Sequence, residues 1–371
     1  MPTDREPIRP SALKYDPSYE KPEPDEAQTE AELIETMTKI QEKTFADGGH
    51  ALRAVHAKSH GLLKGELRVL ADLPPELAQG LFATAARYPV VIRLSTNPGD
   101  LLDDSVSTPR GMALKIVGVS GTRLLGTEDD LTQDFVMVNG PSFLKKDGKS
   151  FLSGLKLLAA TTDRAPGLKK ALSAALRGAE SLVEAVGGKS PTLIGLGGHP
   201  ETHLLGETFY SATPILHGQY MAKVSVAPVS PSLTALTNQP LNVNGKPNGL
   251  RDAVIDFFSR QDAEWELRVQ LCTDLEAMPI ENAKVVWPEE LSPYRAVARI
   301  VVPRQVGWSE ARSKIVDDGF SFSPWHGLSA HRPLGSVNRL RKAAYQMSRR
   351  FRAARNGASA DEPRSLDDFP E

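Results

Sequence analysis

The segment RLRKAAYQMSRRFR, residues 339–352, sets a tyrosine in line with arginines on a predicted helix. At about 100° per residue, one stripe of this helix is apolar and is expected to be buried: Leu340, Ala344, Met347 and Phe351. A second stripe lies directly beside it and carries polar side chains: Arg341, Tyr345, Ser348 and Arg352. The tyrosine and its arginines are therefore expected at the edge of the interior, pointing the same way.

Two interpretations of this helix are open from the segment alone. It fits an ordinary basic helix with a tyrosine at the surface boundary. It also fits a metal ligand, because a phenol with a pKa of about 10 binds metal at neutral pH only if a nearby cation favours the phenolate. Arg341, one turn before Tyr345, supplies such a cation, and Arg352 could hold a carboxylate of the same ligand. Tyrosinate with carboxylate-binding arginines suggests a haem.

Composition bounds the class of protein. The chain has 371 residues with 44 basic and 46 acidic side chains, so its charge suggests no nucleic acid and no anionic membrane surface as a partner. Cys272 is the single cysteine, which excludes an intrachain disulfide and fits a reducing compartment. We find neither an apolar leader nor an uncharged apolar run of the roughly 18 residues that span a bilayer. We expect a globular, cytoplasmic protein with no integral membrane segment.

Short β-branched segments bounded by Gly, Pro, Asp and Asn predict an antiparallel β core, as a barrel or a sandwich. Seven such segments occur in chain order: GELRVLADL, PVVIRLST, GMALKIVGV, DFVMVNG, YMAKVSVAPV, WELRVQLCT and YRAVARIVVP. Helical patterns occur at 28–48, in an insertion at about 150–187, and in the last 50 residues. The predicted fold class is α+β.

Four motifs resemble those of haem catalases. LRAVHAKSHG, residues 52–61, resembles the distal-histidine segment R-x-x-H-A-K-x-x-G, and VVIRLSTNPGD resembles the V-x-R-F-S-T strand. TPRGMALKIVGV resembles D-P-R-G-F-A-V-K-F, with Thr108 in place of the aspartate. Arg341-x-x-x-Tyr345 followed by Arg352 repeats the proximal pattern. Because these motifs occur in the family's order, the chain is identified as a member of the haem catalase superfamily over about 46–352.

The resemblance implies a catalase-like antiparallel β-barrel with an N-terminal arm, a helical insertion and C-terminal helices that carry the haem ligand. Residues 1–45 would form the N-terminal arm and helix. Residues 46–310 would form the barrel, with the poorly matched insertion at about 150–187. Residues 311–371 would form a C-terminal segment with the proximal ligand helix.

The resemblance also implies roles on the distal side of haem b. His56 would be the distal base, which takes a proton from one peroxide oxygen and returns it to the other. Ser95 matches the serine that hydrogen-bonds the distal histidine, and Val55 matches the valine that narrows the peroxide channel. The family's distal asparagine has no counterpart in DDLTQDFVMVNG, where Thr132 or Gln133 lies nearest its place.

On the other side, Tyr345 would be the axial ligand of the haem iron, with Arg341 beside it. Arg53, Arg93 and Arg352 match the three arginines that hold the haem propionates. QM follows the tyrosine where the family has PD, and 19 residues follow Arg352, so the family's C-terminal helical domain is not matched. No NADPH site is evident in the sequence.

These matches predict a haem-dependent oxidoreductase that cleaves hydrogen peroxide or organic hydroperoxides, as a catalase or a catalase-related peroxidase with a role in the oxidative stress response. One alternative is an isomerase or dehydratase of fatty-acid hydroperoxides, and another is a haem-binding protein without turnover. The expected partners are a peroxide and either an organic reductant or a lipid hydroperoxide. A homo-oligomer is left open.

Overall fold

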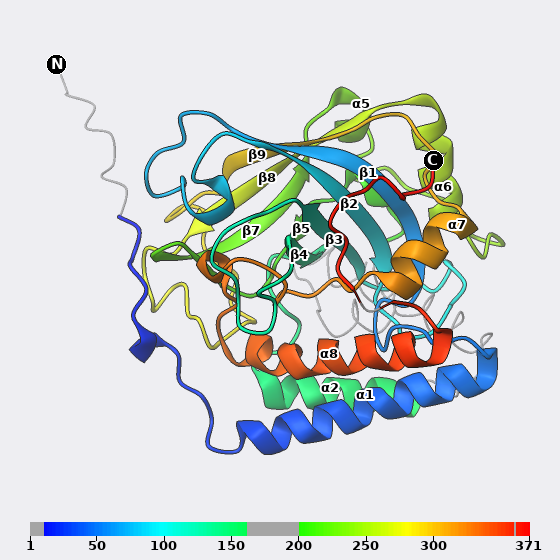
Figure 1. The fold of residues 1–371 in the computed structure, drawn as a ribbon, viewed down its shortest axis with the longest axis horizontal. Helices are drawn as coiled ribbons and strands as arrows, with labels where there is room; N and C mark the ends of the chain where they lie inside the picture. Colours follow the sequence, from blue (N-terminus) through cyan, green and yellow to red (C-terminus); the bar gives the residue numbers. More distant parts are fainter. Residues whose placement is uncertain (1–10, 162–199, 360) are drawn as a thin grey trace, which may run out of the picture.

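Eight antiparallel strands close into a barrel in a computed structural model that describes residues 11–161, 200–359 and 361–371 (Figure 1). Their bounds are β1 Ser59–Val69, β2 Arg87–Thr96, β3 Arg110–Val117, β4 Thr132–Val138, β5 Phe209–Tyr210, β7 Tyr220–Pro228, β8 Ala263–Leu271 and β9 Arg295–Val302. The sheet order is β5-β4-β3-β2-β1-β9-β8-β7, and β7 closes the ring by pairing with β5. A short strand, β6 Ile215–His217, adds to β7. The predicted α+β barrel is confirmed.

The barrel interior is the main core, and strand alternation explains which side chains enter it. In β8, Ala263, Trp265 and Leu267 are buried inside, while Glu264 and Glu266 face outward. β3 behaves differently, because all eight of its residues are buried. Something must therefore cover the outer face of the barrel at β3, and this covered face proves to be where the candidate site lies.

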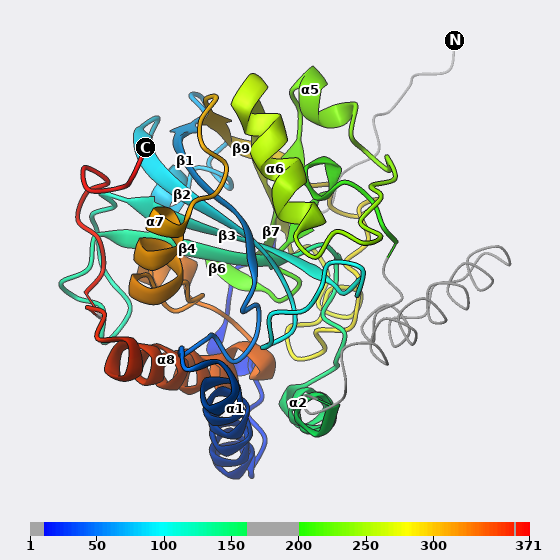
Figure 2. The same ribbon diagram turned by 90° about the vertical axis from the view of Figure 1, so that its right-hand side faces the viewer.

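Three helices lie side by side beneath the barrel: α1 Glu26–Gly48, α2 Gly148–Thr161 and α8 Ser336–Asn356 (Figures 1 and 2). Leu33, Met37 and Ile40 of α1 are buried, as the spacing of residues 28–48 predicts. Leu33 and Met37 pack with Leu340 and Ala344 of α8. The insertion expected at 150–187 begins within α2, and its part beyond Thr161 lies outside the described residues.

The remaining elements connect these parts. The helical turns are η1 Pro17–Tyr19, η2 Gly80–Phe82, η3 Leu204–Gly206, η4 Lys314–Gly319 and η5 Ser329–His331, and the other helices are α5 Pro231–Thr234, α6 Gly249–Arg260 and α7 Glu310–Ser313. After α8, the tail at 361–371 crosses the outer face of the barrel (red in Figure 1) and buries Leu366 and Phe369 there. Within the described residues, no helix is both long and apolar enough to cross a membrane.

The predicted burial of α8 is correct for only half of its apolar stripe. Leu340 and Ala344 are each 1% exposed, whereas Met347 and Phe351 are partly exposed. In the polar stripe, by contrast, Arg341, Ser348 and Arg352 are buried. The reason is that α8 is covered on two sides. Helix α1 packs on its apolar side, and the rest of the protein covers the side that carries its arginines. The arginine stripe is thus inside the protein.

Candidate active site

A cavity with about 600 Å³ of unfilled space, counting its open mouth, lies on the outer face of the barrel. Its walls come from α1, the loop before β1, strands β2–β4, the segment after η4, and α8. The lining residues are Met37, Arg53, Val55, His56, Arg93, Ser95, Gly111, Met112, Ala113, Val136, Met137, Ser321, Phe322, Tyr345, Ser348 and Arg352.

Strand alternation places the distal polar groups. Arg93 and Ser95 of β2 lie two residues apart and so point to the same face. On β3, Gly111 pairs with Ser95 and Ala113 pairs with Arg93. A Cβ at Gly111 would lie 2.8 Å from the Cε1 and Nδ1 atoms of His56, so a larger residue there would displace the imidazole. Glycine at 111 makes room for the ring of His56 against the barrel.

His56 is held by its backbone as well as by its ring. Its φ is +54°, an uncommon conformation for a residue with a side chain. Its N–H donates to the carbonyl of Asn97 at 2.8 Å, and its own carbonyl accepts from Arg93 at 2.9 Å. Its Nδ1 lies 3.1 Å from the hydroxyl oxygen of Ser95, and the tautomer decides which of the two donates. These contacts fix the imidazole at the cavity wall, beside the lining residue Val55.

Electrostatics keep His56 neutral. Burial, and then the charges of Arg93, Arg341 and Arg53, lower the pKa of His56 to about 3. An uncharged imidazole at neutral pH has a free lone pair and can accept a proton from a ligand in the cavity. It can also release that proton readily, because the surrounding arginines disfavour the imidazolium.

Tyr345 enters the cavity from α8. Arg341, one turn earlier, donates from Nη2 to the phenol oxygen of Tyr345 at 3.0 Å, and its guanidinium carbon lies 5.2 Å from the ring centroid. The other terminal nitrogen of Arg341 donates to Asn338 Oδ1 at 3.1 Å. The expected pairing of Arg341 with Tyr345 is therefore present in the geometry.

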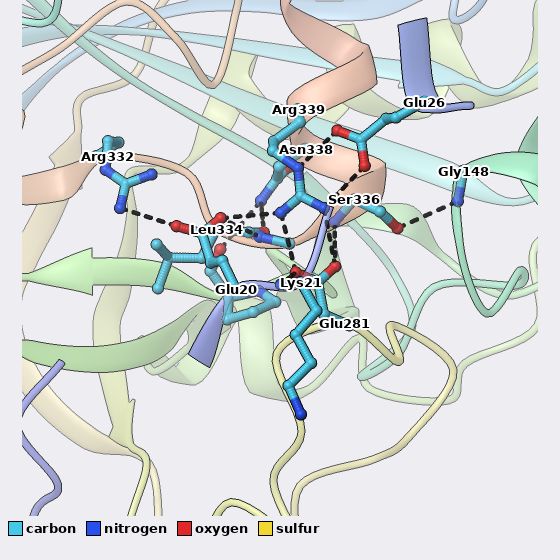
Figure 3. A network of polar contacts seen from close by, with 12 residues as sticks. Glu20, Lys21, Glu26, Gly148, Glu281, Arg332, Leu334, Ser336, Asn338 and Arg339 are labelled. Carbon is cyan, nitrogen blue, oxygen red and sulfur yellow. Dashed lines mark hydrogen bonds and ion pairs between the residues drawn. The ribbon is translucent and has the colours of Figure 1, made fainter. Parts of the chain in front are cut away.

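The first turn of α8 is anchored by carboxylates (Figure 3). Glu281 accepts from the N–H of Ser336 at 2.8 Å, and Glu20 accepts from the N–H of Gly335 at 3.1 Å, so both satisfy donors at the positive end of the helix. Arg339 donates to Glu20, Glu26 and Glu281 through all three of its nitrogens, at 2.6–3.1 Å. This network ties α8 to the N-terminal arm and to the loop that contains Glu281.

Three arginines gather at one end of the cavity: Arg93 and Arg352, which are buried, and Arg53, which is partly buried. Arg53 donates to the carbonyls of Val316 and Phe320, at 2.8 and 3.1 Å, and Arg352 donates to the carbonyl of Phe320 at 3.2 Å. Among the described residues, the Nε atoms of Arg53 and Arg352 have no hydrogen-bond partner although both are buried. Buried donors without partners are rare in folded proteins. They indicate that an acceptor belongs at this end of the cavity.

The charge of this arginine group points to an anion. Burial, and then Arg352 and Arg93, lower the pKa of Arg53 well below its usual value. Burial, and then Arg93, lower the pKa of Arg352 to about 10. Within the described part of the chain, Arg93 is the one of the three that forms an ion pair, with Asp317 at 2.7 Å from its Nε. Burial opposes the charge of Asp317, but Arg93 and Arg53 outweigh it and lower its pKa.

Thr132 and Gln133 are not brought to this cavity. Thr132 is 0% exposed at the start of β4 and donates to Glu362 at 3.2 Å, while Gln133 accepts from the N–H of Leu328 at 2.9 Å. The part of β4 that lines the cavity begins at Val136, four residues beyond Thr132. At the usual rise of a strand, these two residues are about 13 Å apart. The structure therefore gives neither residue the distal position that the sequence suggested.

The structure also adds residues that the sequence reasoning missed. Gly111 matters because of its contact with His56, and Asp317 matters because it pairs with Arg93. Ser321 and Phe322 form part of the wall near the arginines, and the centroid of the Phe322 ring lies 5.8 Å from the guanidinium carbon of Arg53. The alternation of β2 and β3 could have identified Gly111. Nothing local marks Asp317, since it reaches Arg93 across 224 residues.

Comparison with solved structures identifies the fold. The chain is similar to a fungal catalase, with a TM-score of 0.59 and 19% sequence identity over 84% of this chain and 61% of that one. For catalase A from Saccharomyces cerevisiae the TM-score is 0.57 with 19% identity over 83% and 62%, and for a bacterial catalase it is 0.57 with 17% identity over 95% and 64%. No family model and no curated protein matches the sequence.

The chain therefore has the catalase fold, as the sequence motifs predicted. It spans a little under two thirds of the length of each of these catalases.

Proposed function

We propose that this cavity binds haem b and that the protein cleaves the O–O bond of peroxides. The observation that carries the proposal is the joint placement of His56, Tyr345 and three arginines around one cavity. These residues are spread over some 300 positions of the chain. A cavity with a neutral base, a phenol paired to a guanidinium, and a cationic end is suited to chemistry rather than to packing.

The donor set fits a haem. A haem needs an axial ligand, an apolar surround and cations for its two carboxylates. Tyr345 with Arg341 supplies the ligand, and Arg53, Arg93 and Arg352 supply the cations, two of which have buried nitrogens without a partner among the described residues. Met112, Ala113, Val136 and Phe322 supply apolar walls. The Asp317 carboxylate balances the charge of Arg93. The charges of the other two arginines are then available to a dianionic ligand.

When bound, the haem supplies the electrons for O–O cleavage, and the protein supplies the proton movement. His56 would take a proton from one peroxide oxygen and return it to the other, which leaves as water. Burial of His56, and then the arginines around it, assist the second step, because they keep the pKa of the imidazole low. Ser95 and Gly111 hold the ring in place, so that one orientation serves both steps.

The cavity also suggests how the protein handles its substrates. Among the lining residues of the described chain there is no amide side chain, and His56 and Ser95 are the polar groups of the distal wall. A second hydrogen peroxide molecule would thus find few donors to hold it. We infer slow release of oxygen from hydrogen peroxide alone, together with oxidation of an added organic electron donor.

One preparation tests this proposal with two assays. Oxygen release is followed with an electrode and donor oxidation by absorbance, for the wild type and for His56→Gln. Donor oxidation that depends on His56 supports the proposal. Oxygen release at a dedicated catalase's rate, without donor oxidation, would overturn the substrate preference. Rapid consumption of a fatty-acid hydroperoxide, with neither oxygen release nor donor oxidation, would favour an isomerase or dehydratase. Haem binding without any turnover would favour a haem-binding protein that is not an enzyme.

A further inference from the structure

A buried ion cluster lies beside the cavity, on the same outer face of the barrel. Lys115 of β3 and Asp134 of β4 are directly opposite each other in the strand register, and the Nζ of Lys115 is 2.8 and 3.0 Å from the two carboxylate oxygens. Glu362, from the tail, also accepts from this Nζ. The exposed fractions of the three side chains are 0%, 0% and 2%. Ala113 and Val136, the next outward pair along β3 and β4, line the cavity.

Acidic residues with a histidine at close range suggest a metal site, but the charges here are already matched. The ligand atoms of Asp134, His326 and Glu362 lie within 4.8 Å of one another. The ammonium of Lys115 occupies the point between the two carboxylates, and Arg349 lies 3.5 Å from Glu362. A divalent ion would have to displace a lysine that is itself fully buried. The cluster is therefore an ion pair network with another purpose.

That purpose is indicated by what the cluster holds. Asp134 accepts from the N–H of Ser323 at 2.9 Å and donates its own N–H to the carbonyl of His326 at the same distance. His326 Nδ1 lies 3.3 Å from Asp134 and 3.4 Å from Glu362. The Lys115 ammonium lies 5.4 Å from the centroid of the Phe322 ring. Every member of the cluster thus contacts the segment 321–326, which we call the wall segment.

The wall segment connects this cluster to the arginines of the cavity. Ser321 and Phe322 line the cavity, and the ring of Phe322 has Arg53 within 5.8 Å as well as Lys115 within 5.4 Å. The carbonyl of Phe320, immediately before the segment, accepts from both Arg53 and Arg352. A shift of the wall segment would therefore move both guanidiniums. The cluster and the cationic end of the cavity share one structural element.

The tail completes the cluster. Leu366 and Phe369 pack with Val91, Ala113 and Phe322 on the outer face of the barrel. The backbone is held as well, since Lys64 donates to the carbonyl of Leu366 at 3.1 Å and Arg312 donates to that of Pro370 at 2.9 Å. These contacts hold the tail where Glu362 can reach Lys115, 247 residues away in the chain.

We propose that Glu362, together with Lys115 and Asp134, is a positioning unit that sets the wall segment and, through it, the arginines that receive the ligand's carboxylates. Docking of the tail is thereby coupled to the shape of the cavity. The effect on haem rests on the proposed function, whereas the placement of the wall segment does not. The two parts can be measured separately.

The experiment reads the wall segment without haem. Trp325 lies within it, and its Nε1 donates to the carbonyl of Asn338 at 2.7 Å. The chain has four tryptophans, so 5-fluorotryptophan labelling gives few ¹⁹F resonances, and Trp325→Phe assigns the relevant one. The test variant is Glu362→Gln, which keeps Lys115 paired with Asp134. The matched control is Asp361→Asn, the adjacent exposed acid, which contacts Ser359.

We expect Glu362→Gln to shift or broaden the Trp325 resonance in haem-free protein, with the other three unchanged. It should also weaken haem binding about 10- to 100-fold, the usual effect of residues behind a ligand set. Glu362→Asp, which keeps the charge, should restore part of both effects, and Asp361→Asn should alter neither.

An unchanged Trp325 resonance in Glu362→Gln would overturn the positioning role. A shifted resonance with unaltered haem affinity would overturn the link to the cavity. A resonance that shifts when Zn²⁺ is added would make the cluster a metal site and overturn the proposal as well. If Glu362→Gln fails to fold, Glu362→Asp, which shortens the side chain, should still shift the Trp325 resonance, but by less, and an unchanged resonance there would overturn the proposal. Wild-type protein that binds no haem would contradict the proposed function, while the resonance would still test the wall segment.

Discussion

His56 shows how much of the site depends on a single residue's surroundings. Its left-handed backbone costs on the order of 1–3 kcal/mol, which persists only where neighbouring contacts hold it. Asn97, Arg93 and Ser95 provide those contacts, and Gly111 leaves the space. The neutral state of the imidazole then follows from burial and from the arginines nearby.

The first prediction concerns this residue. His56→Gln should retain haem, because the proposed iron ligand comes from α8, and should lose peroxide cleavage by about 10²- to 10⁴-fold, the usual contribution of general acid–base catalysis. Single-turnover reaction with peroxide, followed by stopped-flow absorbance, measures the cleavage step directly. Cleavage at the wild-type rate would show that His56 is not the base.

A second prediction follows from another buried histidine. Burial, and then His217, lower the pKa of His331 to about 3, from an ordinary 6.5. Between these values the unfolded chain binds a proton that the folded chain does not, so the free energy of unfolding falls as the pH drops below 6.5. At pH 5.0 this one group costs about 2 kcal/mol, which is 1.5 pH units at about 1.4 kcal/mol each.

Replacing His331 with Phe removes this pH-dependent loss of stability. The new ring keeps the aromatic neighbours of His331, which are Phe82 and Phe135. Urea unfolding at pH 7.5 and pH 5.0 gives the comparison. The loss of stability on acidification should be about 2 kcal/mol smaller in His331→Phe than in the wild type. The variant also loses the acceptor of the Leu81 N–H. This loss lowers the stability equally at both pH values, so it cancels in the comparison. Equal losses would show that His331 is not held neutral by the fold.

At residue scale, the sequence was informative where a motif specified a side chain and uninformative where the chain had to bring distant groups together. His56, Ser95 and the arginines were named from short motifs, and the cavity contains them. Thr132 and Gln133 were named by counting along a strand that lacked its motif, and the strand carries them away from the cavity. Asp317 and Glu362 have no local signal, because their partners lie hundreds of residues away.

At element scale, α8 decides where the tyrosine points. Carboxylates contact its first turn (Figure 3), and Arg352 further along the helix lines the cavity. Arg339 is the centre of the first group, and it has 18% of its side chain exposed with three glutamates around it. Removing it would leave those three carboxylates facing one another. The third prediction tests this anchor.

Arg339→Met should lower the free energy of unfolding by about 2–4 kcal/mol, because it breaks a partly buried charge network and removes the arginine that pairs with Glu26 and Glu281. Arg350→Met, an exposed position on the same helix, is the control and should stay within about 0.5 kcal/mol of the wild type. Chemical denaturation of both variants measures the difference. Similar stabilities would mean that the network is not an anchor for α8.

The elements that could be predicted are those with enough residues to show a period. β1, β2, β3, β4, β7, β8 and β9 were recognised at least in part from short β-branched segments, and α1 from its helical spacing. β5 and β6 have two and three residues, which is too short for any period, and they were missed although β5 closes the barrel. α6 was also missed, although Leu250, Val254 and Phe257 do fall at helical spacing.

At the scale of the whole molecule, the barrel provides two faces with different roles. Its interior is an apolar core, and its outer face at β2–β4 is covered by α8, the wall segment and the tail. The cavity forms between these layers, so five separate parts of the chain must fold before it exists. This is why the order of motifs could predict the fold, whereas the shape of the cavity required the structure.

The central claim is that a haem occupies this cavity with Tyr345 as its axial ligand. The most direct measurement is the absorption spectrum of the purified protein titrated with haem, beside Tyr345→Phe. The account predicts a saturable Soret band with the features of high-spin ferric haem bound to tyrosinate, and loss of those features or of binding in Tyr345→Phe. Wild-type protein that takes up no haem, or a variant whose spectrum matches the wild type's, would contradict it.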